Sequence, residues 1–271
     1  MSGHWRIDPG VARDLADLLG WDPGGGPAAL TSALGARVPT GSTAKLRAVA
    51  AGEVPPGADP EAIARRVIDD RTTGRPELSW SCWGASTLMA ALLETLADRR
   101  ADVGAIRRVD DDSPPVDIHS LVAVDGLLCD PYFASVVAGP GHDEVERTHG
   151  GAYSRRTDEA DGRWSFQVGN GRWGRTLDYR VLAPVVDRGD VAAFCAISVT
   201  HSGAPSRPLA MLKRPTDAVE VFTHGEGGAA VRTWTWTDPD HIWEGTTDQV
   251  EHPDWAAATE DFAARTGIPL L

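Results

Sequence analysis

The chain has 271 residues, of which 42% are hydrophobic and 24% are charged, so it contains enough apolar material for a substantial globular core. Its formal net charge of −13 argues against nucleic acid or an anionic membrane as a partner. The segment 1–6 lacks a hydrophobic signal core, and no apolar run approaches membrane-spanning length. We therefore expect a cytoplasmic protein that does not contact membranes.

The first part of the chain is expected to be helical. Short amphipathic segments at 11–19 and 28–34 flank a glycine-rich turn, and Asp59-Pro60 opens a helix that runs from Glu61 towards Asp70. A further helix begins near Cys82, where apolar side chains recur at intervals of three and four residues and form one apolar face. Either Ser79 or Ser81 suits the N-cap position of this helix.

Short strands follow from about residue 103. We expect strands at 104–109, 121–124, 127–129, 164–168, 177–182, 193–199, 219–223 and 231–237, a loop over 142–159, and a final helix at 255–265. The expected helices come first in the chain, the strands follow, and the C-terminal part contains both. This order indicates an α+β protein, because a fold with a parallel sheet would alternate strands and helices along the chain.

The segment from His119 to Asp130 is predicted to form a hairpin. Asp125-Gly126 is a strong two-residue turn signal, which pairs Val124 with Leu127 and Leu121 with Asp130. His119 then lies on the same sheet face as Asp130 and diagonal to it, roughly 7–8 Å away along the backbone. A register shifted by one residue would separate them onto opposite faces.

Three residue types in this order favour nucleophilic catalysis. A thiol at a helix N-terminus, such as that of Cys82, is stabilised as thiolate by the helix dipole. An imidazole oriented by a carboxylate, here His119 and Asp130, can accept the proton of the thiol. Each residue also has a structural alternative: a buried small side chain for Cys82, a surface strand residue for His119, and a turn-forming residue before Pro131 for Asp130.

The remaining cysteines give no sign of a disulfide framework or a metal centre. Cys82, Cys129 and Cys195 are odd in number and widely spaced, and no pair has metal-ligand spacing. We therefore expect neither disulfides nor a bound metal.

A nucleophile on a helix that packs against a sheet carrying histidine and aspartate is typical of papain-like cysteine enzymes. We predict this fold in three regions: a helical region over 1–98 with the nucleophile helix, a β-rich region over 99–200 with a central antiparallel barrel or sheet, and an α/β lid over 201–271.

Five segments match the motifs of a known family in part: Trp5-Arg6-Ile7-Asp8, Arg37-Val38-Pro39-Thr40-Gly41-Ser42, residues 76–84 around Cys82, Asp130-Pro131-Tyr132-Phe133-Ala134, and Thr266-Gly267-Ile268-Pro269-Leu270. In these segments the chain resembles the arylamine N-acetyltransferases, a transglutaminase-like and papain-related family. The Arg-Gly-Gly and Glu that surround the family's cysteine are missing here, and the Gly-Phe-Gly after its aspartate is changed. The pattern fits a divergent member, such as an amide synthase.

The resemblance implies Cys82 as nucleophile, His119 as base and Asp130 as the residue that orients it. It also implies a ping-pong reaction without a bound cofactor, in which an acyl thioester of coenzyme A or of a carrier protein donates to a small amine. Trp83 and Phe133 are candidates for an apolar acceptor pocket, or are core residues. Two alternatives remain open: a transglutaminase-like hydrolase or peptide-processing enzyme with the same triad, and a catalytically silent binding protein.

Overall fold

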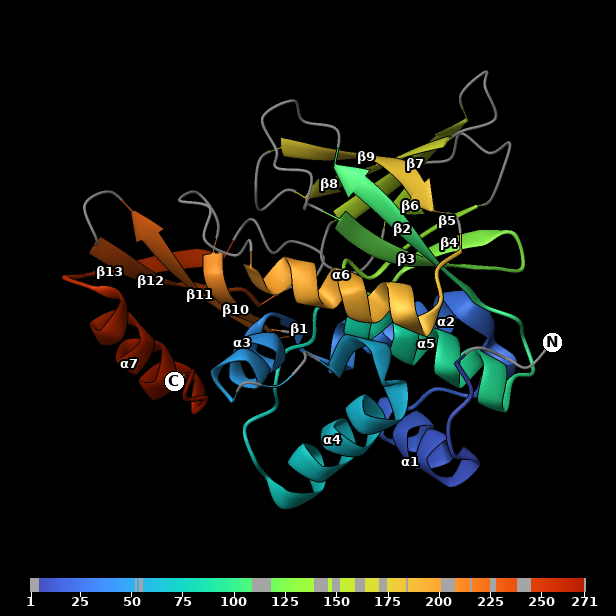
Figure 1. Cartoon of the computed structure of the whole chain (residues 1–271), viewed down its shortest axis with the longest axis horizontal. Coiled ribbons are helices and arrows are strands. Elements are labelled where there is room, and N and C mark those ends of the chain that lie inside the picture. The colour runs from blue at the N-terminus through green and yellow to red at the C-terminus, as the bar shows by residue number, and fades with distance from the viewer. Residues whose placement is uncertain are drawn as a thin grey trace.

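The computed structural model describes residues 5–51, 53, 56–108, 118–138, 146–147, 152–158, 164–170, 175–183, 185–200, 208–214, 216–224, 228–237 and 245–270 (Figure 1). Its helices are α1 (Pro9–Leu19), η1 (Pro23–Gly25), α2 (Gly26–Arg37), α3 (Thr43–Ala50), η2 (Pro56–Ala58), α4 (Pro60–Thr73), α5 (Cys82–Leu96), α6 (Arg188–Thr200) and α7 (Trp255–Thr266). Its strands are β1 (Thr40–Gly41), β2 (Asp102–Arg108), β3 (Ile118–Val124), β4 (Leu127–Asp130), β5 (Ser135–Ala138), β6 (Glu146–Arg147), β7 (Ala152–Asp158), β8 (Trp164–Asn170), β9 (Arg175–Ala183), β10 (Pro208–Lys213), β11 (Asp217–His224), β12 (Gly228–Thr235) and β13 (Thr246–His252).

Local signals in the sequence explain where the N-terminal helices begin and end. The Asp8 carboxylate accepts hydrogen bonds from the first backbone N–H groups of α1, and Asp59 does the same for α4. Gly20 and Gly74 end these helices in the left-handed conformation that glycine adopts without strain. The helices predicted at 11–19, 28–34 and 61–70 are thus confirmed.

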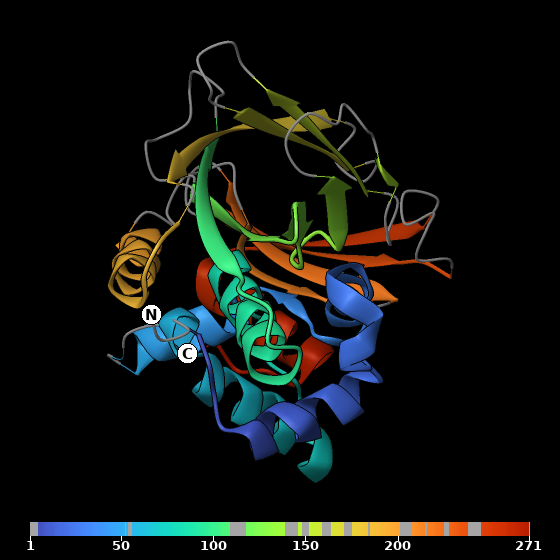
Figure 2. The same cartoon turned by 90° about the vertical axis from the view of Figure 1, so that its right-hand side faces the viewer.

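Helix α5 is the central helix of the molecule. Helices α1, α2 and α4 contact it on one side, and strands β2 and β3 contact it on the other (Figures 1 and 2). Its side chains from Trp83 to Glu94 are consequently buried around the whole circumference. The expectation of a single apolar face was wrong, because neighbouring elements cover the small and hydroxyl-bearing faces as well.

An eight-stranded antiparallel sheet lies above α5, in the order β5-β4-β3-β2-β9-β8-β7-β6 (Figure 2). The sheet curls so that β5 contacts β6 and β7. Among the described strands no ladder joins these two ends, so the barrel in our prediction is an open, curled sheet. The α+β class is confirmed, and the papain-like details stay a prediction.

Two further expectations from the sequence were wrong. The segment 193–199 belongs to helix α6, because a short apolar run fits a buried helix as well as a strand. Residues 152–158, placed in a loop, form β7 between β6 and β8. The ladder with β8 supplies hydrogen bonds to a segment whose polar side chains give no strand pattern.

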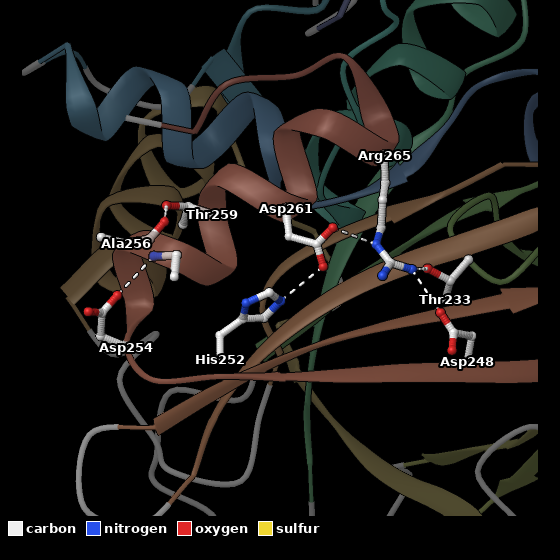
Figure 3. A network of polar contacts seen from close by, with 9 residues as sticks. Thr233, Asp248, His252, Asp254, Ala256, Thr259, Asp261 and Arg265 are labelled. Carbon is white, nitrogen blue, oxygen red and sulfur yellow. Dashed lines mark hydrogen bonds and ion pairs between the residues drawn. The ribbon is translucent and has the colours of Figure 1, made fainter.

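A second antiparallel sheet, in the order β1-β10-β11-β12-β13, carries α7 on one face. Arg265 of α7 donates hydrogen bonds to Asp261 at 2.8 Å, to Thr233 of β12 at 3.0 Å and to Asp248 of β13 at 3.1 Å (Figure 3). Asp261 also meets His252 Nε2 at 2.9 Å. This polar network fastens the helix to the sheet. Strand β1 pairs with Trp80, two residues before Cys82, so this sheet also reaches the start of α5.

Candidate active site

Cys82 is the first residue of α5, as predicted. Ser81 is the N-cap, and its hydroxyl accepts from the Gly84 N–H at 3.4 Å. The Cys82 side chain is partly exposed. The other cap candidate, Ser79, is fully buried and instead bonds to Thr43 and to the Met211 carbonyl. The thiol therefore lies at the positive end of a fifteen-residue helix.

The hairpin has the register expected from its turn. Val124 pairs with Leu127, and the ladder continues to Val122 and Cys129. Asp125 and Gly126 both have positive φ, 51° and 79°, as a type I′ turn requires. This register brings His119 Nε2 to 2.6 Å from Asp130 Oδ2, and both side chains are buried.

Asp130 uses both carboxylate oxygens. Oδ2 meets His119, while Oδ1 accepts from the backbone N–H groups of Tyr132 and Phe133, each at 3.0 Å. The turn-forming role that the sequence offered as an alternative is therefore present together with the contact to histidine. Contacts on both oxygens hold the carboxylate in one orientation.

Aromatic rings enclose the His119 imidazole. The ring centroids of Phe133, Tyr179 and Tyr132 lie 5.2, 5.4 and 5.8 Å from it. Phe133, one of the two predicted acceptor-pocket residues, is 5% exposed and packs against the imidazole. Trp83, the other, is 2% exposed and stacks on Phe194 of α6 at 5.0 Å, within the main core. A contact of either residue with substrate stays a prediction.

His119 interacts electrostatically with both of the other predicted residues, Asp130 and Cys82. Burial alone would lower the pKa of His119, but the charges of Asp130 and Cys82 and hydrogen bonds to both side chains raise it to about 10. His119 Nε2 is engaged with Asp130, and the same imidazole interacts electrostatically with Cys82.

Contacts that the sequence did not predict support this arrangement. Ser120 of β3 donates to Ser86 of α5 at 3.0 Å, and both hydroxyls are fully buried. Lys45 and Cys195 also interact electrostatically with Cys82. No sequence signal links these residues, because they come from α3 and α6; only the rarity of lysine, at positions 45 and 213, distinguishes Lys45.

The described residues contain no cluster of three histidine, cysteine or acidic side chains placed to hold a metal ion. Within the same part of the chain, no helix is both long and apolar enough to cross a membrane.

No family model and no curated protein matches this chain. Solved structures do match. A Cys-to-Gln variant of Mycobacterium smegmatis arylamine N-acetyltransferase is 18% identical, with a TM-score of 0.63, over 97% of this chain and 93% of that one. Another structure titled M. smegmatis arylamine N-acetyltransferase is also 18% identical, with a TM-score of 0.61 over the same shares. The Nocardia farcinica arylamine N-acetyltransferase is 14% identical, with a TM-score of 0.60, over 98% and 93%. The chain therefore has the arylamine N-acetyltransferase fold, and the resemblance read from its sequence is confirmed for the fold.

Proposed function

We propose that this protein is a cysteine-dependent acyltransferase that moves an acyl group from a thioester to an amine. One observation carries the proposal: the buried His119 imidazole meets the Asp130 carboxylate at 2.6 Å and interacts electrostatically with Cys82, the first residue of α5. The likeness over nearly the whole chain to structures titled arylamine N-acetyltransferase supports transfer as the reaction.

In the first half-reaction, the Cys82 thiolate attacks the carbonyl carbon of the thioester. The bond from that carbon to the donor sulfur breaks, and the imidazolium of His119 gives its proton to the leaving thiol. The N–H groups of Gly84 and Ala85 are occupied by Ser81. The amides of Cys82 and Trp83, at the start of the helix, are therefore the first-turn donors assigned to the developing oxyanion.

In the second half-reaction, neutral His119 accepts a proton from the incoming amine as the amine attacks the acyl-cysteine. The bond to Cys82 breaks, the amide leaves, and the thiolate is restored beside the imidazolium. Asp130 keeps the ring oriented in both halves and stabilises the imidazolium. Every proton released in one half is used in the other, so the cycle requires no bound cofactor.

The donor is a thioester of coenzyme A or of a carrier protein, because exchange between two sulfurs is nearly isoenergetic. The acceptor is a small amine, and formation of an amide in biosynthesis suits the changed motif around Cys82. Phe133 and Trp83 remain the proposed apolar residues near the acceptor.

Intact-protein mass spectrometry after incubation with acetyl-CoA and longer acyl-CoA thioesters tests the proposal. We expect a mass increase of one acyl group on the wild type and on Cys129→Ala, and none on Cys82→Ala. An added amine should remove the adduct and yield an amide. Release of free acid at the same rate with and without amine would identify a hydrolase. An unreactive Cys82 would overturn the enzyme hypothesis.

A further inference from the structure

A buried pair of hydroxyl groups joins helix α5 to strand β3. Ser120 Oγ of β3 donates a hydrogen bond to Ser86 Oγ of α5 at 3.0 Å, and both side chains are fully buried. Their neighbours on this face of the sheet, Ala105 and Val122, are apolar and belong to the main core. A hydroxyl buried among apolar groups loses its hydrogen bonds to water, so each serine depends on the other for a partner.

The two serines are close in the chain to the proposed nucleophile and base. Ser86 follows Cys82 by four residues, so the two side chains lie on the same side of α5, about one turn apart. Ser120 follows His119, and successive side chains of a strand point to opposite faces. Ser120 therefore faces α5, whereas His119 faces the ring of Tyr179 on the other side of the sheet. The hydrogen bond thus holds β3 against α5 at the residue next to His119.

A different set of contacts orients the imidazole. His119 Nε2 meets Asp130 Oδ2 at 2.6 Å, and the backbone N–H groups of Tyr132 and Phe133 hold the other oxygen of that carboxylate. These contacts lie within residues 119–133, so they orient the ring without attaching it to α5. Apolar contacts between α5 and the sheet are non-directional and permit small shifts. The serine pair is a directional contact across the same interface, so it fixes where β3 stands along the helix.

We propose that Ser86 and Ser120 form a positioning pair that sets the distance between the Cys82 thiol and the His119 imidazole. The inference rests on the function proposed above, because it concerns the same two groups. Without the hydrogen bond, α5 and β3 are free to shift relative to one another, and a displacement of about 1 Å can slow a reaction by about 10²-fold. Proton transfer from the thiol to the imidazole is the step affected, because it requires hydrogen-bond distance.

The rate of Cys82 alkylation by iodoacetamide at pH 7 and pH 10, followed by peptide mass spectrometry, tests the pair without an acyl donor. An ordinary thiol is mostly protonated at pH 7 and depends on a neighbouring base, so Ser86→Ala and Ser120→Ala should react about tenfold more slowly than wild type. At pH 10 an ordinary thiol is ionised without a base, so the three rates should agree within about twofold. His119, Lys45 and Cys195 interact electrostatically with Cys82, and all three are unchanged in these variants.

Thr87 supplies a matched control, because it follows Ser86 on α5 and is also fully buried. Its hydroxyl contacts the Gly57 carbonyl of η2 at 2.8 Å and the Gly84 carbonyl at 3.3 Å, and neither belongs to the hairpin. Thr87→Val should therefore lower the free energy of unfolding but keep the wild-type alkylation rate at both pH values. Equal slowing in Thr87→Val would mean that loss of any buried hydroxyl on α5 has this effect, and would overturn the proposal.

The double variant Ser86→Ala/Ser120→Ala shows whether the two serines act as one unit. We expect it to react no more slowly at pH 7 than either single variant, since the second substitution has no hydrogen bond left to remove. Losses that multiply would instead assign each serine a separate effect and contradict the pair. Where an alanine variant does not fold, Ser120→Cys replaces it, because a thiol is only slightly larger than a hydroxyl and is a weak donor.

The same data separate this inference from the proposed function. Single variants that react at the wild-type rate at pH 7 would overturn the positioning role and leave the function proposed for Cys82 intact. Wild-type Cys82 that reacts at pH 7 no faster than N-acetylcysteine would remove the proposed function, and the role of the serine pair with it.

Discussion

His119 Nε2 and Asp130 Oδ2 lie 2.6 Å apart although the two residues are eleven positions apart in the chain. The contact depends on the two-residue turn of the β3–β4 hairpin, which fixes the register. The far oxygen of the same carboxylate is held by two backbone N–H groups of residues 132 and 133. The orientation of the imidazole is therefore set by backbone geometry on both sides of the pair.

Asp130→Asn should lower kcat/KM for acyl transfer by about 10²–10⁴-fold, the usual contribution of a positioned acid–base group. The amide is isosteric but carries no charge to stabilise the imidazolium. The measurement is steady-state transfer from acetyl-CoA to an amine. Asp125→Asn, in the exposed turn of the same hairpin, is the control and should keep the wild-type rate. Equal losses in both variants would assign the effect to the hairpin as a whole.

The charge on His119 should link folding stability to pH. The pKa of His119 is raised from 6.5 to about 10 in the folded protein. A raised pKa stabilises the fold fully below pH 6.5, and that stabilisation is lost as the pH rises through about 10. The free energy of unfolding of wild type, relative to His119→Gln, should therefore decrease from pH 6 to pH 10. Urea unfolding at pH 6, 8 and 10 measures this difference; a constant difference would contradict the assignment.

Gly35 is needed where α2 meets the turn that follows Asp130. A Cβ on Gly35 would stand 2.2 Å from the Cβ of Ala134, which itself has a positive φ of 55°. We expect Gly35→Ala to lower the free energy of unfolding by about 1–3 kcal/mol through overpacking. Ala134→Gly removes the opposing methyl group and suits the left-handed backbone. The double variant should therefore regain much of the loss in urea unfolding, and independent, additive losses would exclude this steric contact.

The parts of the site that follow local rules were predictable from the sequence. The Asp125-Gly126 turn determines the register that joins His119 to Asp130, and the cap at Ser81 determines where α5 begins. Both depend on residues adjacent in the chain. The same local signals define α1 and α4.

The parts that depend on long-range contacts were not predictable. Residues 193–199 were predicted as a strand because their apolar run has no distinguishing period, whereas in the structure they belong to helix α6, which packs beside η2. Trp83 was predicted to line a pocket, and its stacking on Phe194 depends on where α6 lies. The attachment of α3 to the segment before Cys82 depends on the Thr43–Ser79 contact, whose members are 36 residues apart.

Asp261 should make the attachment of α7 sensitive to acid. Burial would raise the pKa of Asp261, but hydrogen bonds and charge from Arg265 and His252 outweigh it and lower that pKa below its ordinary value of 3.8 (Figure 3). A carboxylate whose pKa is lowered by folding stabilises the fold at pH values above its pKa in the unfolded chain. That stabilisation is lost as the pH falls through its pKa in the folded protein. Asp261→Asn should thus lower the free energy of unfolding at pH 7 by about 1–2 kcal/mol, given its partial exposure.

The cost of Asp261→Asn should shrink as the pH falls below 3.8, the ordinary value for an aspartate, because the wild-type carboxylate is then progressively protonated. Thermal unfolding of both proteins at pH 7, 4 and 2.5 measures this convergence. Glu260→Gln changes the same charge at the neighbouring, exposed position of α7 and should cost little at any pH. Cys82 alkylation should be unchanged in both variants, since α7 lies on the second sheet and not on the hairpin that carries His119. A cost for Asp261→Asn that is the same at all three pH values would assign the residue a role in packing instead of charge.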